Sequence, residues 1–286
     1  MGVNHQVFNL ISTDGTVLKG RYWKPNSFPI ATICLVHGIG EHAARYDSWA
    51  RRFCAEGIMV YALDYRGHGA SEGKKGVVNS IAELNDDINA MVRRCKRSWS
   101  DIPNFIYGHS MGGALVLNYL IKRRNDFEGA IITSPWLELV HPPSEFKIKA
   151  LKWLDLLRPT LTFSTGIKSD QMTSEPVKKQ DADNDPLVHS RISVRLFNQV
   201  NARAQEILTN KLNIKVPILL AHALADPLTN PLTTKKWAEK HAPLTQFVGY
   251  QGALHELHNE PVADELFNDI LQFIKDHLGD PKPKSY

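Results

Sequence analysis

The sequence predicts an α/β fold in which a mainly parallel sheet is covered by helices on both faces. Short apolar runs typical of buried strands alternate with amphipathic stretches at helical spacing, which favours parallel strands joined by crossover helices. The chain has 286 residues, 43% of them hydrophobic, and can therefore bury a sizeable core. One strand-to-helix turn also carries glycines around a serine, a pattern typical of such sheets.

The N-terminal half is predicted to begin with an antiparallel edge. Segments 6–11 and 17–23 flank Asp14-Gly15 and indicate a hairpin. Strands and helices then alternate: we expect strands over 30–36, 58–63, 104–109 and 130–133, and helices over 46–55, 81–95 and 114–120.

The alternation stops after residue 133. Prolines cluster there, no buried strand is evident before residue 213, and helices are predicted over 145–157 and 190–208. We therefore expect residues 134–212 to form a helical cap inserted between two parts of one core, 1–133 and 213–286. The core resumes with expected strands over 216–221 and 245–250, and with helices over 233–241 and 261–278.

Composition gives no sign of a nucleic-acid partner. The 34 basic and 30 acidic residues leave a net charge of +4 and are spread along the chain, without a basic patch interleaved with aromatic residues. The N-terminus lacks a basic segment followed by an apolar run, and no stretch is apolar enough to span a membrane. Cys34, Cys54 and Cys95 lack metal-ligand spacing and are typical of buried reduced thiols. We expect a cytoplasmic protein without a metal or cofactor, whose contact with membranes is transient and peripheral.

The strongest functional signal is the turn around Ser110, which has the G-x-S-x-G pattern of a nucleophile elbow. Gly108 and Gly112 flank the serine, an apolar strand precedes it and a buried helix follows. So tight a turn needs glycine, because side chains at these positions would collide with the adjoining strand or helix. We therefore predict that Ser110 is a catalytic nucleophile.

A serine hydroxyl needs a general base and a carboxylate that orients the base. In sheets with this elbow the acid follows the serine and the histidine comes last. Asp226 and His255 satisfy this order, and each follows a predicted strand. His258 competes for the role of base. Asp264 and Asp269 compete less well with Asp226, because they fall in the closing helix and after His255.

Two backbone N–H groups are predicted to form an oxyanion hole. His37-Gly38-Ile39-Gly40 follows the third strand, where the N–H of Ile39 and that of Met111, the residue after the nucleophile, would face a developing alkoxide. Taken alone, this loop could equally be a glycine turn at a strand-to-helix corner. The glycine-rich segment 64–73 lacks nucleotide-binding spacing, and we expect its Arg66 and His68 to hydrogen-bond nearby loops.

These motifs together resemble the monoacylglycerol lipase and lysophospholipase group of α/β hydrolases. The segments that carry the resemblance span most of the chain: 37–42, 67–73, 108–113, 184–187, Asp226 and 252–258. The resemblance implies an α/β-hydrolase fold, a triad of Ser110, Asp226 and His255, oxyanion donors at Ile39 and Met111, and a mobile cap whose apolar face admits an acyl chain.

A pocket for the polar head group is predicted from Glu41 and Arg45, which follow the oxyanion loop, and from His258, which follows the proposed base. A surface salt bridge beside an exposed histidine is the alternative. The cap helix over 145–157 carries an apolar stripe formed by Ile148, Leu151, Trp153, Leu154 and Leu157. This stripe either packs the cap on the core, lines an acyl tunnel or contacts lipid, in which case the interspersed lysines would meet anionic head groups.

The predicted function is hydrolysis of monoacylglycerols, lysophospholipids or similar acyl esters through an acyl-enzyme intermediate. Carboxylesterases and proline iminopeptidases keep the serine and stay open as alternatives. A non-catalytic ligand-binding protein on the same scaffold is a third possibility, since fold does not fix function.

Overall fold

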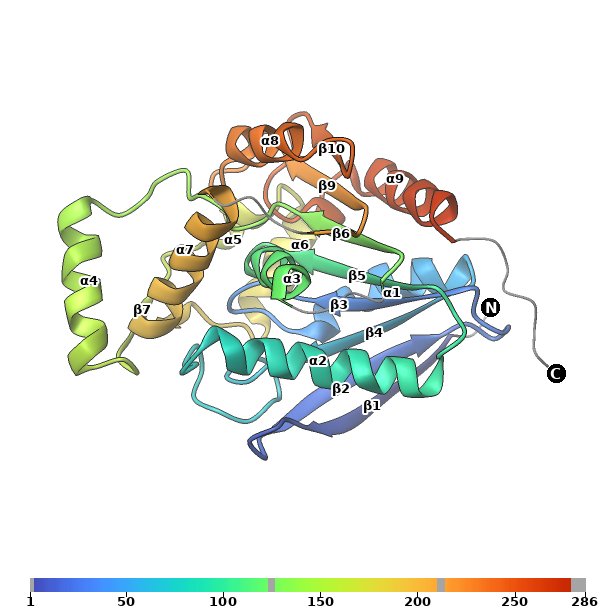
Figure 1. Ribbon diagram of the computed structural model, residues 1–286, viewed down its shortest axis with the longest axis horizontal. Coiled ribbons are helices and arrows are strands. Elements are labelled where there is room, and N and C mark those ends of the chain that lie inside the picture. The colour runs from blue at the N-terminus through green and yellow to red at the C-terminus, as the bar shows by residue number, and fades with distance from the viewer. Residues whose placement is uncertain (1–2, 123–126, 210–213, 279–286) are drawn as a thin grey trace.

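The computed structural model describes residues 3–122, 127–209 and 214–278, and an eight-stranded sheet lies at its centre (Figure 1). The strand order is β1-β2-β4-β3-β5-β6-β9-β10. The strands are β1 (Asn4–Ile11), β2 (Val17–Lys24), β3 (Ala31–Val36), β4 (Ile58–Asp64), β5 (Asn104–His109), β6 (Gly129–Thr133), β9 (Ile218–Ala223) and β10 (Thr245–Tyr250).

The sheet is parallel except at its N-terminal edge, as predicted. Strands β1 and β2 form an antiparallel hairpin, and β2 pairs antiparallel with β4. The remaining neighbours in the sheet, β4-β3-β5-β6-β9-β10, run parallel to one another. Their carboxyl ends therefore meet at one edge, where ligands bind in open α/β sheets.

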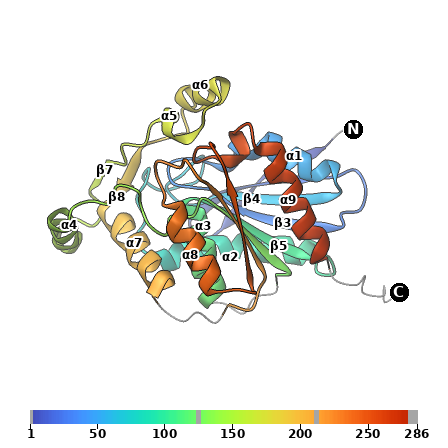
Figure 2. The same cartoon turned by 90° about the horizontal axis from the view of Figure 1, so that it is seen from above.

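Helices cover both faces of the sheet (Figure 2), and a separate apolar core lies between the sheet and the helices on each face. One core contains Trp49 and Phe53 of α1 (Asp47–Ala55) and Ile270 of α9 (Ala263–Asp276). The other contains apolar residues of four helices, α2 (Ile81–Ser98), α3 (Met111–Lys122), α7 (Val194–Thr209) and α8 (Pro231–Lys240). Two short 3₁₀ turns, Ala43–Tyr46 and Leu257–Asn259, complete the loops around these helices. The predicted fold class is confirmed.

The chain leaves the sheet after β6 and returns at β9. The intervening part contains α4 (Glu145–Leu157), β7 (Thr162–Ser164), α5 (Ser169–Met172), α6 (Pro176–Asn184), β8 (Arg191–Ser193) and α7 (Val194–Thr209). Figure 1 shows α4 at the left edge of the molecule, beyond α7; α4 packs on α7, which packs on α3. We call residues 134–209 the inserted segment; the predicted cap boundary at residues 212 and 213 lies outside the described residues.

Two expectations for this segment were wrong. The predicted helix 190–208 begins only at Val194, because residues 191–193 form β8 and pair antiparallel with β7. Ile192 of β8 is also fully buried, although no buried strand was expected here. Strands of three residues are too short to show the alternation by which strands are recognised.

The three cysteines are free thiols and are buried, as expected. Within the described ranges, no helix has both the length and the apolar character needed to cross a bilayer.

Candidate active site

Ser110 lies at the sharp turn between β5 and α3. Its φ of 54° is in the left-handed region, which non-glycine residues rarely adopt. A Cβ atom added to Gly112 would lie 2.2 Å from the carbonyl oxygen of Val36, and one on Gly108 would lie 2.6 Å from that of Gly112. The predicted reason for both glycines is therefore correct, and the tight packing around the turn fixes the strained serine in place.

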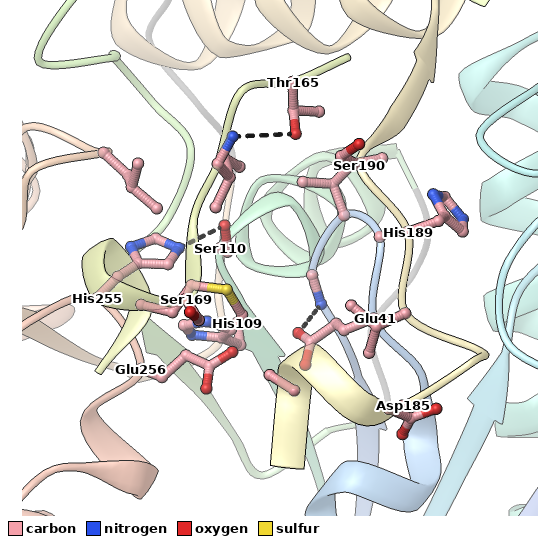
Figure 3. A pocket seen from close by; sticks show the side chains of 18 of the residues that line it. Glu41, His109, Ser110, Thr165, Ser169, Asp185, His189, Ser190, His255 and Glu256 are labelled. Atoms are coloured by element: carbon pink, nitrogen blue, oxygen red, sulfur yellow. Dashed lines mark hydrogen bonds between the residues drawn. The ribbon is translucent and has the colours of Figure 1, made fainter. Parts of the chain in front are cut away.

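The structure brings Ser110, His255 and Asp226 together at the carboxyl edge of the sheet. His255 follows β10, and its Nε2 lies 2.8 Å from Oγ of Ser110; Figure 3 shows this contact as a dashed line. Nδ1 of His255 lies 2.7 Å from Oδ2 of Asp226, which follows β9. All three residues are buried. The serine can thus pass its proton to an imidazole that a carboxylate orients.

The competing residues occupy other environments. Asp264 and Asp269 lie on α9, where they contact Arg52 and the hydroxyl of Tyr250, respectively. The ring of His258 stacks on Tyr46 with a centroid distance of 4.6 Å. Geometry therefore favours His255 over His258 as the base.

Asp226 is held as a carboxylate by several donors. Its Oδ1 accepts from the backbone N–H groups of Leu228 and Thr229, and its Oδ2 accepts from the Thr229 hydroxyl and from His255. Although burial opposes the charged form, His255 and the neighbouring His222 lower the pKa of Asp226. Burial also disfavours imidazolium at His255, but the neighbouring Asp226 carboxylate outweighs it and raises the pKa of His255 above its ordinary value.

The predicted oxyanion loop lies against the nucleophile. A Cβ atom on Gly38 would be 3.1 Å from Cβ of Ser110, and Ile39 lines the adjoining cavities. Met111 is the first residue of α3. Among the residues described, no acceptor receives the N–H of Ile39 or of Met111. Both donors are thus available for a ligand oxygen beside Ser110.

Two cavities meet at Ser110 and His255. The larger, of about 750 Å³, has a mostly apolar wall to which the inserted segment contributes Trp136, Leu139, Leu151, Phe163 and Phe197. The smaller, of about 250 Å³, has a wall of mixed polar and apolar character; besides His255, its charged and histidine residues are Glu41, His109, Asp183, Asp185, His189 and Glu256, several of which Figure 3 labels. An apolar chain and a polar group attached to one reacting carbon could occupy both at once.

The predicted head-group residues are only partly at the cavity. Glu41 lines the smaller cavity, but neither Arg45 nor His258 lines either of the two. Arg45 lies behind the wall and pairs with Glu41 at 3.1 Å and with Glu256 at 2.7 Å. In this structure, therefore, Arg45 and His258 do not face either cavity, and the salt bridge of Arg45 is not exposed at the surface. Both side chains are buried, because the two glutamates and Tyr46 provide their partners.

The two glutamates that flank Arg45 have opposite pKa shifts. Burial raises the pKa of Glu41 to about 7. Burial also acts on Glu256, but Arg45 outweighs it and lowers the pKa of that carboxyl to about 2. Burial lowers the pKa of His258 to about 4. At neutral pH the group thus holds a neutral histidine and one firmly ionised pair, Arg45 with Glu256.

Several cavity residues were not predicted. Thr165 and His189 come from loops of the inserted segment that carry no motif, whereas Asp185 lies in segment 184–187, which carries part of the resemblance but was given no role in the site. Glu256 could have been noticed beside His255, and His222 lies four residues before Asp226 at a strand end. His222 is fully buried, with Nε2 3.2 Å from Oδ2 of Asp226. Arg66 bonds Asp14 of the hairpin turn, as expected, and also Asp87 on α2, whereas Nδ1 of His68 lies 3.2 Å from the carbonyl oxygen of Arg66 in its own loop.

Comparison with known proteins identifies relatives across this whole region. The model of the family described as serine aminopeptidase, S33, matches residues 27–262. The chain is 32% identical to human monoglyceride lipase over 277 residues, which cover 93% of this chain and 89% of that protein. It is 32% identical to an abhydrolase domain-containing protein of Dictyostelium discoideum over 98% of this chain, but spans only 30% of that longer protein.

The fold is shared with solved structures. A soluble variant of monoglyceride lipase from Saccharomyces cerevisiae, solved with a substrate analogue, superposes with a TM-score of 0.84 at 23% identity, covering 98% of this chain and 97% of that one.

Proposed function

The chain belongs to the serine aminopeptidase S33 family and is a serine hydrolase, and we propose from this that it cleaves monoacylglycerols or similar acyl esters. The observation that carries the proposal is the hydrogen-bonded chain from Ser110 through His255 to Asp226, which lies where a mostly apolar cavity meets a smaller one whose mixed wall holds charged side chains. An ester of a fatty acid and a polar alcohol has this shape, with its carbonyl carbon between the two parts.

In the proposed reaction, Oγ of Ser110 attacks the ester carbonyl while Nε2 of His255 takes the hydroxyl proton. Asp226 holds the imidazole and stabilises its protonated form. The tetrahedral intermediate collapses as His255 passes the proton to the leaving alcohol, which leaves the acyl group on Ser110. A water molecule, deprotonated by the same imidazole, then releases the fatty acid.

We assign the oxyanion of each tetrahedral intermediate to the backbone N–H groups of Ile39 and Met111. Their location beside Ser110 and their lack of other acceptors among the described residues support this. Removing one such donor typically costs 10²- to 10³-fold in turnover, roughly, so the two together account for much of the expected rate.

We assign the acyl chain of the substrate to the larger cavity and its alcohol to the smaller one. Glu41 contributes a charged group to the wall of the smaller cavity, whereas Arg45 and His258 support that wall from behind. Residues 134–212 would then act as the cap, because the inserted segment supplies much of the apolar cavity.

The outer face of α4 suggests how a lipid substrate reaches the cap. Phe146, Trp153, Leu156 and Leu157 are exposed, as are the nearby lysines Lys147, Lys149 and Lys152. Apolar side chains mixed with lysines suit the surface of an anionic bilayer. We propose transient docking at such a surface by a protein of the cytoplasm, where its free cysteines would stay reduced.

Labelling with a fluorophosphonate and a panel of substrates test the proposal. Wild type and a Ser100→Ala control, which alters an exposed serine, should be labelled and should hydrolyse oleoylglycerol, whereas Ser110→Ala should do neither. The panel should include oleoyl lysophosphatidylcholine, p-nitrophenyl butyrate and proline naphthylamide. Preference for the naphthylamide would favour an aminopeptidase, and wild type that is neither labelled nor active would favour a binding protein.

A further inference from the structure

The carbonyl oxygen of Gly38 receives two side chains that the proposed reaction does not use directly. The hydroxyl of Tyr65, which follows β4, donates to this oxygen over 2.6 Å. Nδ1 of His37 lies 2.8 Å from the same oxygen. The two rings are stacked, with centroids 4.1 Å apart and planes 15° apart, and both side chains are fully buried. They form a rigid, dry support beneath the oxyanion loop.

Both side chains act as donors. Burial raises the pKa of Tyr65, so its phenol keeps its proton, and burial lowers the pKa of His37, so its imidazole is neutral and carries one proton. Nε2 of His37 is buried and has no partner among the described residues, whereas Nδ1 faces a carbonyl, which can only accept. The proton of His37 therefore belongs on Nδ1.

The Gly38 carbonyl and the Ile39 N–H belong to one peptide unit. That unit is planar and trans, so its C=O and N–H point in opposite directions. Holding the oxygen toward Tyr65 and His37 therefore fixes the direction in which Ile39 donates. We propose that Tyr65 and His37 are positioning residues that aim the Ile39 N–H at the oxyanion through the Gly38 carbonyl; this rests on the oxyanion role assigned to Ile39 above.

The neighbouring peptide unit is held as well. The N–H of Gly38 donates to Oε1 of Glu41, and the hydroxyl of Tyr65 also lies 3.2 Å from the carbonyl oxygen of His37. The loop is thus tied on both sides of Gly38 and has little freedom to rotate. Two donors on one carbonyl also polarise its peptide, which makes the attached N–H a stronger donor. Orientation and polarisation act on the same N–H and should both increase turnover.

Tyr65→Phe tests the proposal, because it removes one hydroxyl and keeps the ring and its stack. Tyr250→Phe is the matched control: Tyr250 is equally buried, but its hydroxyl donates to Asp269 on α9, away from the oxyanion loop. We would measure kcat and KM on p-nitrophenyl butyrate, thermal unfolding, and inhibition by a trifluoromethyl ketone, whose adduct with Ser110 places an oxyanion in the hole.

Tyr65→Phe should lower kcat about tenfold and raise the inhibition constant of the trifluoromethyl ketone by a similar factor, while KM stays within about twofold. Tyr250→Phe should leave kcat, KM and the inhibition constant of the ketone unchanged. The inference is overturned if Tyr65→Phe retains full kcat, if only KM changes, or if kcat falls while the inhibition constant of the ketone stays the same. Wild type that fails to hydrolyse any ester would instead refute the proposed function, so the two failures are distinguishable.

Discussion

Nε2 of His222 lies 3.2 Å from Oδ2 of Asp226, so a second histidine contacts the carboxylate oxygen that orients His255. His222 lies near the end of β9, four residues before Asp226, and Asp226 lies in the loop that follows this strand. Burial lowers the pKa of His222, which makes it neutral, and the oxygen atoms around Nε2 assign its proton to that nitrogen. His222 thus shares the negative charge that would otherwise act on His255 alone.

The first prediction concerns pH dependence. Activity requires neutral His255, and the pKa of this residue is raised, so kcat/KM should rise with pH and reach half its maximum above the ordinary imidazole value of 6.5. His222→Leu should move that midpoint further upward, because Asp226 then acts more strongly on His255, whereas His222→Gln keeps a donor and should move it less. A midpoint below 6.5 in wild type, or a downward move in His222→Leu, would contradict this account.

The second prediction separates the two histidines of the base loop. His255→Ala should lower turnover by roughly four to six powers of ten, as loss of a triad member does. His258→Ala should instead lower the free energy of unfolding by roughly 1–3 kcal/mol, because it removes the buried ring that stacks on Tyr46. Steady-state kinetics and urea unfolding of both variants check this. An inactive but fully stable His258→Ala would reverse the assignment.

The third prediction follows from the burial of Arg45. Its side chain is only 9% exposed and pairs with two buried glutamates, so Arg45→Met should cost about 3 kcal/mol of stability. Arg51→Met is the matched control, because Arg51 and its partner Asp47 are 45% and 43% exposed; it should cost less than about 1 kcal/mol. Since Arg45 lines neither cavity, activity on oleoylglycerol and on p-nitrophenyl butyrate should fall together. A loss confined to oleoylglycerol would return Arg45 to the head-group pocket.

The contrast between Ser110 and Arg45 shows what the sequence can predict. The turn around Ser110 imposes local steric requirements, which the flanking glycines satisfy, so the motif and its structure imply each other. The same holds for the positions of the core strands along the chain, which follow from apolar runs. The direction of a long side chain such as that of Arg45 depends on partners from distant loops, including Glu256, and no local pattern encodes it.

The inserted segment illustrates the same limit. Helix α4 was predicted with its observed ends, because its apolar spacing is regular. Strands β7 and β8 were missed, because each has three residues and is stabilised by the other rather than by its own pattern. The support of the oxyanion loop by Tyr65 was also invisible, since it joins residues 27 positions apart through a single hydroxyl.

The fourth prediction concerns the exposed face of α4. Wild type should sediment with vesicles that contain anionic lipid, and Trp153→Ser and Leu156→Ser should each weaken this binding about fivefold, since each removes roughly 1 kcal/mol of apolar contact. Leu232→Ser is the control, because Leu232 is 64% exposed but lies on α8. Hydrolysis of p-nitrophenyl butyrate in solution should not change in any of the three. Equal vesicle binding by all variants would show that α4 is not the lipid-binding face.

The last prediction uses two leucines of α4 that lie in different environments. Leu151 lines the larger cavity, whereas Leu156 is 79% exposed on the same helix. Each methylene buried in the cavity contributes about 0.8 kcal/mol, so kcat/KM for p-nitrophenyl esters should rise roughly fourfold for each added carbon until the cavity is full. Leu151→Trp fills part of that space, and its profile should level off at a shorter acyl chain than in wild type. Leu156→Trp adds the same ring outside the cavity and should leave the profile unchanged. If both variants gave the wild-type profile, or if wild type showed no dependence on acyl length, the larger cavity would not be the acyl site.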